Sequence, residues 1–388
     1  MSASLLVLSC LAYVSMALPD SVLGVAWPGM SVSLDQPIGA LGLLLPFGVG
    51  AAVLSSALTG RLLSWLPLGR LLSGSTWLSV LAVVGYAVAP SFWGVVGATV
   101  LLGLASGAID AALNAYAASR FSARQITWMH ASYGLGSVVG PAVVTAVLSA
   151  ELGWRLAYAL VAGAQAALGC AFLLNTRRWA AARPRPLARP KGPAPRSGRG
   201  LVLGSVVFVL QMGVEGGIGL WGYLYLTSAQ GLPADVAGLV VSGYWAVMFV
   251  GRLGLGQLAE RVGIGPVLAA SVAGIVAGTG AMAAPGPAPL AVGGMLLVAL
   301  ASAPVFPLLI LTTADRVGPA QADRAVGAQM AAANGSNVLL PGTIGLLVER
   351  FDAAVIGPAL LAVALAMAAA YALLARLHPA RVPAVERG

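Results

Sequence analysis

Long apolar segments dominate this sequence. Twelve apolar runs, separated by polar breaks, are centred near residues 16, 49, 80, 106, 137, 164, 214, 245, 274, 301, 335 and 364. A run of about 20 apolar residues is the length at which an α-helix crosses a bilayer. Only 9% of the residues are charged, 59% are hydrophobic and the mean hydropathy is +0.92, which excludes a soluble globular protein. The sequence therefore predicts an all-α polytopic membrane protein with twelve transmembrane helices.

The basic residues predict the orientation of these helices. All but two of the 21 Lys and Arg residues fall in loops on the side of the two termini, the exceptions being Arg155 and Arg350. Since basic loops stay on the cytoplasmic side, both termini are expected there. The first run lacks the basic start of a signal peptide and is expected to remain as a helix. The high Ala, Gly, Arg and Pro content favours a bacterial source and hence the inner membrane.

The longest loop, residues 176–200, is basic, rich in proline and free of acids. Such a segment is expected to be extended, and it separates a first six-helix bundle, residues 1–175, from a second, residues 201–388. Attraction to anionic lipid and topological anchoring explain its charge more simply than nucleic-acid binding, so no nucleic-acid partner is expected.

The two halves of the chain repeat one another. Leu101–Arg120 aligns without a gap with Leu297–Arg316, and Arg124–Pro141 aligns with Arg324–Pro341. Two parallel repeats of six helices predict two bundles related by a pseudo-two-fold axis along the membrane normal. In this plan a solute binds near the bilayer midplane between the bundles.

Three carboxylates, Asp20, Asp110 and Glu215, lie deep inside apolar runs, and no Lys or Arg is expected at comparable depth. A charge at the bilayer centre costs about 2.5 kcal/mol or more, so such residues usually face a cavity and serve a function. Desolvation favours the protonated form of a carboxylic acid, which lets it bind a proton and release it on hydration. We expect these three acids to couple proton movement, the alternative being that each hydrogen-bonds a neighbouring helix.

Polar and aromatic side chains on the same runs form a candidate solute site. Asp110 and Asn114 lie one helical turn apart, as do Gln211 and Glu215, so each acid has an amide beside it. On the first run Tyr13, Asp20 and Trp27 repeat every seven residues and share one face, which is expected to line the cavity. The candidate solute-binding residues are Trp27, Asp110, Asn114, His130, Gln211, Trp221, Tyr244, Asn334 and Asn337.

The chemistry of these side chains suits a sugar, because amides, acids and His bond hydroxyl groups and aromatic faces cover a ring. Packing between helices is the alternative role for each of them. The sequence has no nucleophile elbow, phosphate-binding glycine loop or metal-ligand cluster, so no enzyme, cofactor or metal is predicted. Cys10 and Cys170 are interpreted as packing residues.

One loop carries a family signature. Residues 256–263, GQLAERVG, resemble the loop between helices eight and nine of the major facilitator superfamily, whereas the first-half copy around Arg61 and Arg70 lacks the usual acid. The resemblance implies that Glu260 pairs with Arg252 or Arg261 to gate the conformational change. A purely structural role is the alternative.

A narrower resemblance is to the fucose permease-like sugar and proton symporters. It rests on blocks at Leu18–Asp20, Gly24–Pro28, Asp110 with Asn114, Trp128–Gly136 and Glu215–Trp221. It implies that Asp20 couples protons and that Asp110 handles sugar and proton. The chain departs from that branch where Asp110 replaces a glutamate and where His130 replaces an amide.

These observations predict a monomeric secondary transporter that couples protons to uptake of a sugar or similar small polar solute by alternating access. The alternative is a proton-driven antiporter that exports a drug or amphipathic metabolite, because Gly136–Pro141 partly resembles the glycine and proline signature of antiporters. A membrane sensor that binds a ligand without transport is less favoured, since acids are retained in both halves.

Overall fold

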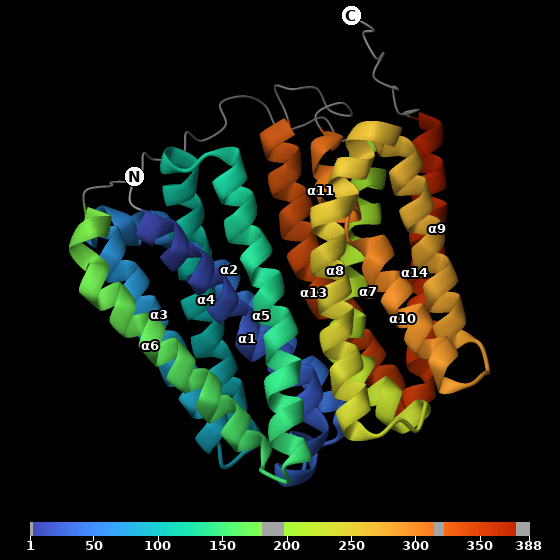
Figure 1. The fold of residues 1–388 in the computed structure, drawn as a ribbon, viewed down its shortest axis with the longest axis horizontal. Coiled ribbons are helices and arrows are strands. Elements are labelled where there is room, and N and C mark those ends of the chain that lie inside the picture. Colours follow the sequence, from blue (N-terminus) through green and yellow to red (C-terminus); the bar gives the residue numbers. More distant parts are fainter. Residues whose placement is uncertain (1–2, 181–197, 314–321, 378–388) are drawn as a thin grey trace, which may run out of the picture. The chain divides into compact units, whose positions relative to one another are not determined.

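The computed structural model describes residues 3–180, 198–313 and 322–377, and the described chain is helical throughout, without strands (Figure 1). Twelve segments of it are long and apolar enough to cross a membrane, and each contains one of the centres expected from the sequence. The predicted all-α, twelve-helix class is therefore confirmed. In an apolar solvent a helix is favoured because it satisfies its backbone hydrogen bonds internally.

The helices have the following bounds. The first half contains α1 (Ala3–Ser33), a short 3-10 turn (Ile38–Ala40), α2 (Leu41–Trp65), α3 (Leu68–Val88), α4 (Phe92–Arg120), α5 (Ala123–Ser149) and α6 (Trp154–Ala180). The second contains α7 (Arg199–Leu224), a π-helical turn (Tyr225–Ala229), α8 (Ala234–Val262), α9 (Ile264–Ala283), α10 (Ala288–Ser302), α11 (Val305–Leu311), α13 (Ala322–Arg350), a 3-10 turn (Ala353–Val355) and α14 (Ile356–Leu377).

The segment expected as a linker, residues 176–200, is partly helical at both ends. Helix α6 continues through Ala180 and α7 begins at Arg199, while residues 181–197 lie outside the described residues. By its contacts the chain divides into two compact units. One holds α1 to α6 with residues 234–242, and the other holds α7, the remainder of α8, and α9 to α14.

Glycines allow close helix packing within the first unit. A Cβ added at Gly136 of α5 would overlap the carbonyl oxygen of Val14 on α1, and one at Gly107 of α4 would overlap that of Ala52 on α2. Small residues at helix interfaces let two backbones approach in this way. The close approach at Gly136 sets α1 against α5, the helix that carries His130.

The two repeats differ within one pair of aligned helices. Helix α4 is continuous, whereas the segment aligned with it is broken at Ala303–Pro304 into α10 and α11. Proline lacks a backbone N–H, so a helical hydrogen bond is lost at Pro304, although Ala303 before it keeps helical dihedral angles. By contrast Pro141 and Pro341, aligned in sequence, both lie inside continuous helices, α5 and α13.

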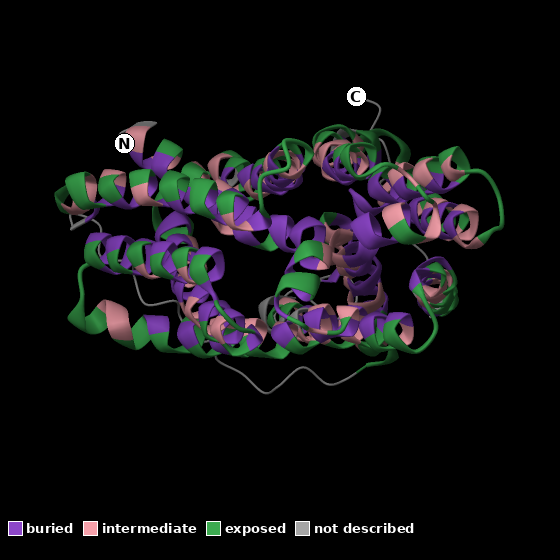
Figure 2. Cartoon of the chain, turned by 90° about the horizontal axis from the view of Figure 1, so that it is seen from below, coloured by how far each residue is buried: buried purple, intermediate pink, exposed green. Residues whose placement is uncertain are grey.

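Exposed and buried residues alternate around most helices, so that a helix presents one face to its neighbours and another outward (Figure 2). The outward faces include many large apolar side chains, among them Leu174, Val250 and Leu339. Apolar side chains on outward faces are expected where the surroundings are lipid tails.

Candidate functional site

Asp110 is the centre of a polar cluster in the first unit. The hydroxyl of Tyr13 on α1 donates a hydrogen bond to Asp110 Oδ1 over 2.7 Å, and Nδ2 of Asn114 donates to the same oxygen over 3.0 Å. In the described part of the chain Oδ2 accepts no hydrogen bond. The His130 ring of α5 packs edge-on against Tyr13, with ring centroids 5.0 Å apart. Two helices, α1 and α4, therefore supply donors to the carboxylate, and α5 joins the cluster through the contact of His130 with Tyr13.

The cluster combines buried and accessible groups. Tyr13 is buried, Asp110 and Asn114 are partly buried, and the side chain of His130 is exposed. Three expected residues, Asp110, Asn114 and His130, are thus brought together. Tyr13 was not among the expected solute-binding residues, although its seven-residue spacing from Asp20 was a signal for it. The free carboxylate oxygen and the exposed imidazole can each form further hydrogen bonds.

The other two residues of the α1 stripe have different surroundings. Asp20 has an exposed side chain and forms no hydrogen bond or ion pair with any described residue. Trp27 is 1% exposed, and its indole N–H donates to the carbonyl oxygen of Ile38 over 2.7 Å. The stripe therefore joins a buried tyrosine, an accessible acid and a buried tryptophan bonded to backbone.

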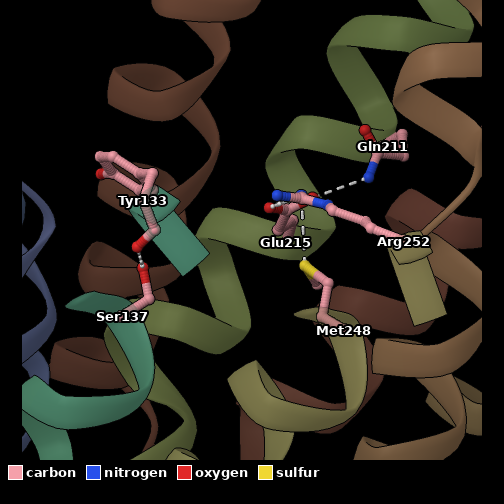
Figure 3. A network of polar contacts seen from close by, with 6 residues as sticks. All are labelled: Tyr133, Ser137, Gln211, Glu215, Met248 and Arg252. Atoms are coloured by element: carbon pink, nitrogen blue, oxygen red, sulfur yellow. Dashed lines mark hydrogen bonds and ion pairs between the residues drawn. The ribbon is translucent and has the colours of Figure 1, made fainter. Parts of the chain in front are cut away.

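Glu215 is the centre of a second cluster, formed by α7 and α8 (Figure 3). Gln211 Nε2 donates to Glu215 Oε2 over 3.0 Å, and Arg252 Nη2 forms an ion pair with Glu215 Oε1 over 2.9 Å. The same nitrogen contacts the sulfur of Met248 at 3.3 Å. The expectation that no Lys or Arg lies at comparable depth is therefore wrong for Glu215. The long side chain of an arginine lets its charge reach an acid far from its own Cα, which the position along the sequence does not reveal.

The residues expected to gate the conformational change are Arg252, Glu260 and Arg261, and their surroundings differ. Arg252 pairs with Glu215, and this is the one ion pair within 4.0 Å among the residues that the structure describes. Glu260 and Arg261 are exposed near the end of α8. Arg252 and Glu260 are eight residues apart on one helix, a rise of about 12 Å, so they do not meet along α8. Among the described residues Glu260 forms no ion pair with Arg252 or Arg261, and the gating role of these residues stays a prediction.

The remaining candidates lie mainly in packed positions. Trp221 is fully buried and its indole N–H donates to the carbonyl oxygen of Pro341 over 2.8 Å. Tyr244 is fully buried, and its hydroxyl has no hydrogen-bond partner in the described chain. Asn337 is partly buried, with Oδ1 directed at Gly216. Asn334 lies on α13, but its side chain is outside the described residues.

The Asp110 and Glu215 clusters supply acids, amides and an imidazole as hydrogen-bonding groups. In the described ranges no three His, Cys, Asp or Glu side chains come close enough to hold a metal ion. What the two clusters can do is accept and donate hydrogen bonds to a polar solute, and bind or release protons at carboxyl groups.

Comparison with known proteins identifies a matching family and solved structures of similar fold. The family model described as Major Facilitator Superfamily matches residues 9–341. A search of curated proteins found no match. Among solved structures, a mutant of the nucleoside transporter NupG has a TM-score of 0.77 at 17% identity, covering 95% of this chain and 98% of that one.

Two further structures are similar in the same way. The inward-facing, occupied structure of a bacterial homolog to the human lysosomal transporter Spinster has a TM-score of 0.77 at 15% identity, covering 98% of this chain and 99% of that one. A mutant of the peptide transporter POT has a TM-score of 0.74 at 12% identity, with coverage of 96% and 95%. At these identities the likeness is one of fold.

Proposed function

The chain belongs to the major facilitator superfamily and is a multi-pass membrane transporter of a small solute, not an enzyme; we propose that it couples proton movement to uptake of a sugar or similar small polar solute. In this proposal the transport cycle proceeds by alternating access between two six-helix bundles, residues 1–175 and 201–388. We further propose that the monomer lies in a bacterial inner membrane with both termini cytoplasmic.

The different surroundings of the three acids carry this proposal. Asp110 accepts hydrogen bonds from Tyr13 and Asn114, and Glu215 has a counter-charge, Arg252. Asp20 has no hydrogen-bond donor and no counter-charge among the described residues, although it too lies in an apolar membrane-spanning helix. A carboxylate without a counter-charge in a bilayer is costly unless it is hydrated or protonated. Asp20 therefore is the residue that would bind a proton in one state and release it in another.

The Asp110 cluster supports a hydroxyl-rich solute. Oδ2 of Asp110 is an acceptor free of protein donors in the described chain, and the exposed His130 beside it offers a donor and an acceptor. A solute hydroxyl placed between them would donate a hydrogen bond to Asp110 Oδ2 and form a second hydrogen bond with the His130 imidazole. Neither group offers a large apolar face, so small polar solutes fit this cluster better than lipophilic drugs.

Transport by the purified protein in liposomes tests the proposal. The panel contains monosaccharides together with a nucleoside and a dipeptide, because nucleoside and peptide transporters share the fold. We expect accumulation of one polar solute under an inward proton gradient, and its loss with a proton ionophore. Failure of every polar solute, together with export of a lipophilic cation against the proton gradient, would replace symport by antiport.

The Asp20→Asn variant tests the assignment of the proton. It removes the titratable group but keeps the size and polarity of the side chain, so gradient-driven uptake should be lost while solute counterflow persists. Asp35→Asn is the matched control, because Asp35 is an exposed carboxylate in the turn after α1 whose positive φ of 52° asparagine tolerates. Undiminished gradient-driven accumulation by Asp20→Asn would remove Asp20 from the coupling mechanism.

A further inference from the structure

The cluster on α7 and α8 contains polar atoms that no described residue satisfies. A guanidinium has five N–H donors, and both contacts of Arg252 use Nη2. Its Nε and Nη1 donors therefore have no partner in the described chain, although the side chain is only 33% exposed. Gln211 Oε1 also has no hydrogen-bond partner in the described chain, and its side chain is 0% exposed.

These unsatisfied atoms belong to one place. Arg252 is held at Glu215 by the ion pair, and it contacts the sulfur of Met248 one turn earlier on α8. Gln211 is tied to the same acid by its other amide atom. A buried polar group without a partner costs about 1–3 kcal/mol, and this cost is retained at Gln211 Oε1, beside the unpaired donors of Arg252. Such a pattern is typical of a site whose partner is a ligand.

The charge of the cluster defines the group it can take. Glu215 neutralises Arg252 through one nitrogen, Nη2, and Nε and Nη1 form no hydrogen bond with a described residue. Planar guanidinium donors match the two oxygens of a carboxylate, and bonds between charged partners are roughly twice as strong as neutral ones. A neutral hydroxyl would use one donor and gain less. A dianionic phosphate would bring two negative charges to a pair that is already neutral.

We propose that Gln211 and Arg252, the α7–α8 site, bind a carboxylate-bearing part of the transported solute. Nε and Nη1 of Arg252 hold the carboxylate, and Gln211 Oε1 accepts from an adjacent hydroxyl. The inference rests on the proposed transport of a polar solute and narrows that solute to a hydroxy acid, with a sugar acid as the representative case.

Binding of matched pairs to the purified full-length protein tests this site. In each pair a carboxylate replaces a hydroxymethyl group: galactose and galacturonate, glucitol and gluconate, and propane-1,2-diol and lactate. Titration calorimetry should show at least one acid binding about tenfold or more tightly than its neutral partner, as one charge-assisted hydrogen bond provides. Equal affinity within every pair, or no binding of any acid, would overturn the proposal.

Substitutions distinguish a loss of binding at the α7–α8 site from a loss of the folded structure. Arg252→Gln should abolish the preference for the acid, but it leaves Glu215 without its counter-charge and can unfold the protein. The double variant Glu215→Gln with Arg252→Gln removes both charges together, so it should stay folded and still lose the preference. Arg376→Gln, at an exposed arginine in the last turn of α14, should keep it. Persistence of the preference in the folded double variant would refute the assignment to Arg252.

The outcomes also distinguish this inference from the proposed function. If wild-type protein accumulates neutral sugars under a proton gradient and binds acids no better, the α7–α8 site is refuted while proton-coupled transport stands. If acids bind with the expected preference but no solute responds to a proton gradient, the site stands and the coupling is refuted.

Discussion

The ion pair between Glu215 and Arg252 makes a quantitative prediction about stability. Replacing Arg252 by methionine keeps the length of the apolar stem but leaves Glu215, whose side chain is 12% exposed, without a counter-charge. Removing one partner of a fully buried pair costs about 3–5 kcal/mol. The cost is smaller here because Gln211 still donates to Glu215 and because the pair is partly exposed. We therefore expect a loss of about 2 kcal/mol in the free energy of unfolding.

The double variant decides whether that loss arises from the pair. Glu215→Gln alone should cost about 1 kcal/mol, because Arg252 is a third exposed and its charge can reach water. Combining it with Arg252→Met leaves no unpaired charge and keeps an amide beside Gln211. The double variant should therefore lose less than the sum of the two single variants, with a coupling free energy of about 1–2 kcal/mol.

Equilibrium unfolding in mixed detergent micelles, followed by circular dichroism, gives the four free energies of this cycle. Arg376→Met serves as the control, since this exposed arginine forms no ion pair with a described residue and should change stability by less than about 0.5 kcal/mol. A coupling free energy below about 0.5 kcal/mol would refute the reasoning, because it would mean that Glu215 does not depend on Arg252.

Two further predictions follow from other contacts. Tyr13→Phe removes the donor 2.7 Å from Asp110 but keeps the ring, so it should weaken solute binding about tenfold or more while leaving the helical content unchanged; unaltered affinity in calorimetry would contradict a role for this bond in setting Asp110. Gly107→Ala should lower the thermal unfolding temperature, because its methyl group would overlap the carbonyl oxygen of Ala52, whereas Gly97→Ala, with open space around it, should leave that temperature the same or raise it slightly; equal effects of the two substitutions would argue against close packing of α2 and α4.

Much of the candidate site was predictable from residue type and helical spacing. Asp110 with Asn114, and Gln211 with Glu215, lie one turn apart on single helices, and the structure shows both pairs hydrogen-bonded. These contacts are local, so a 3.6-residue period is enough to find them. The sequence did not identify Tyr13 as the partner of Asp110 or Arg252 as the partner of Glu215. Each lies on a different helix from its acid, so its distance from the acid in space is unrelated to its distance along the chain.

The sequence by itself determined the class of this protein, its twelve spans and the positions of its intramembrane acids. It could do so because a bilayer forces each long apolar run to satisfy its own backbone hydrogen bonds, which makes the helix a local property. Only the tertiary structure decided that Glu215 has a counter-charge, that Asp110 is held by a tyrosine and that Asp20 has no such partner within the described ranges. Those differences depend on which helices pack together and how far each side chain reaches, and packing of this kind is set by contacts remote in sequence.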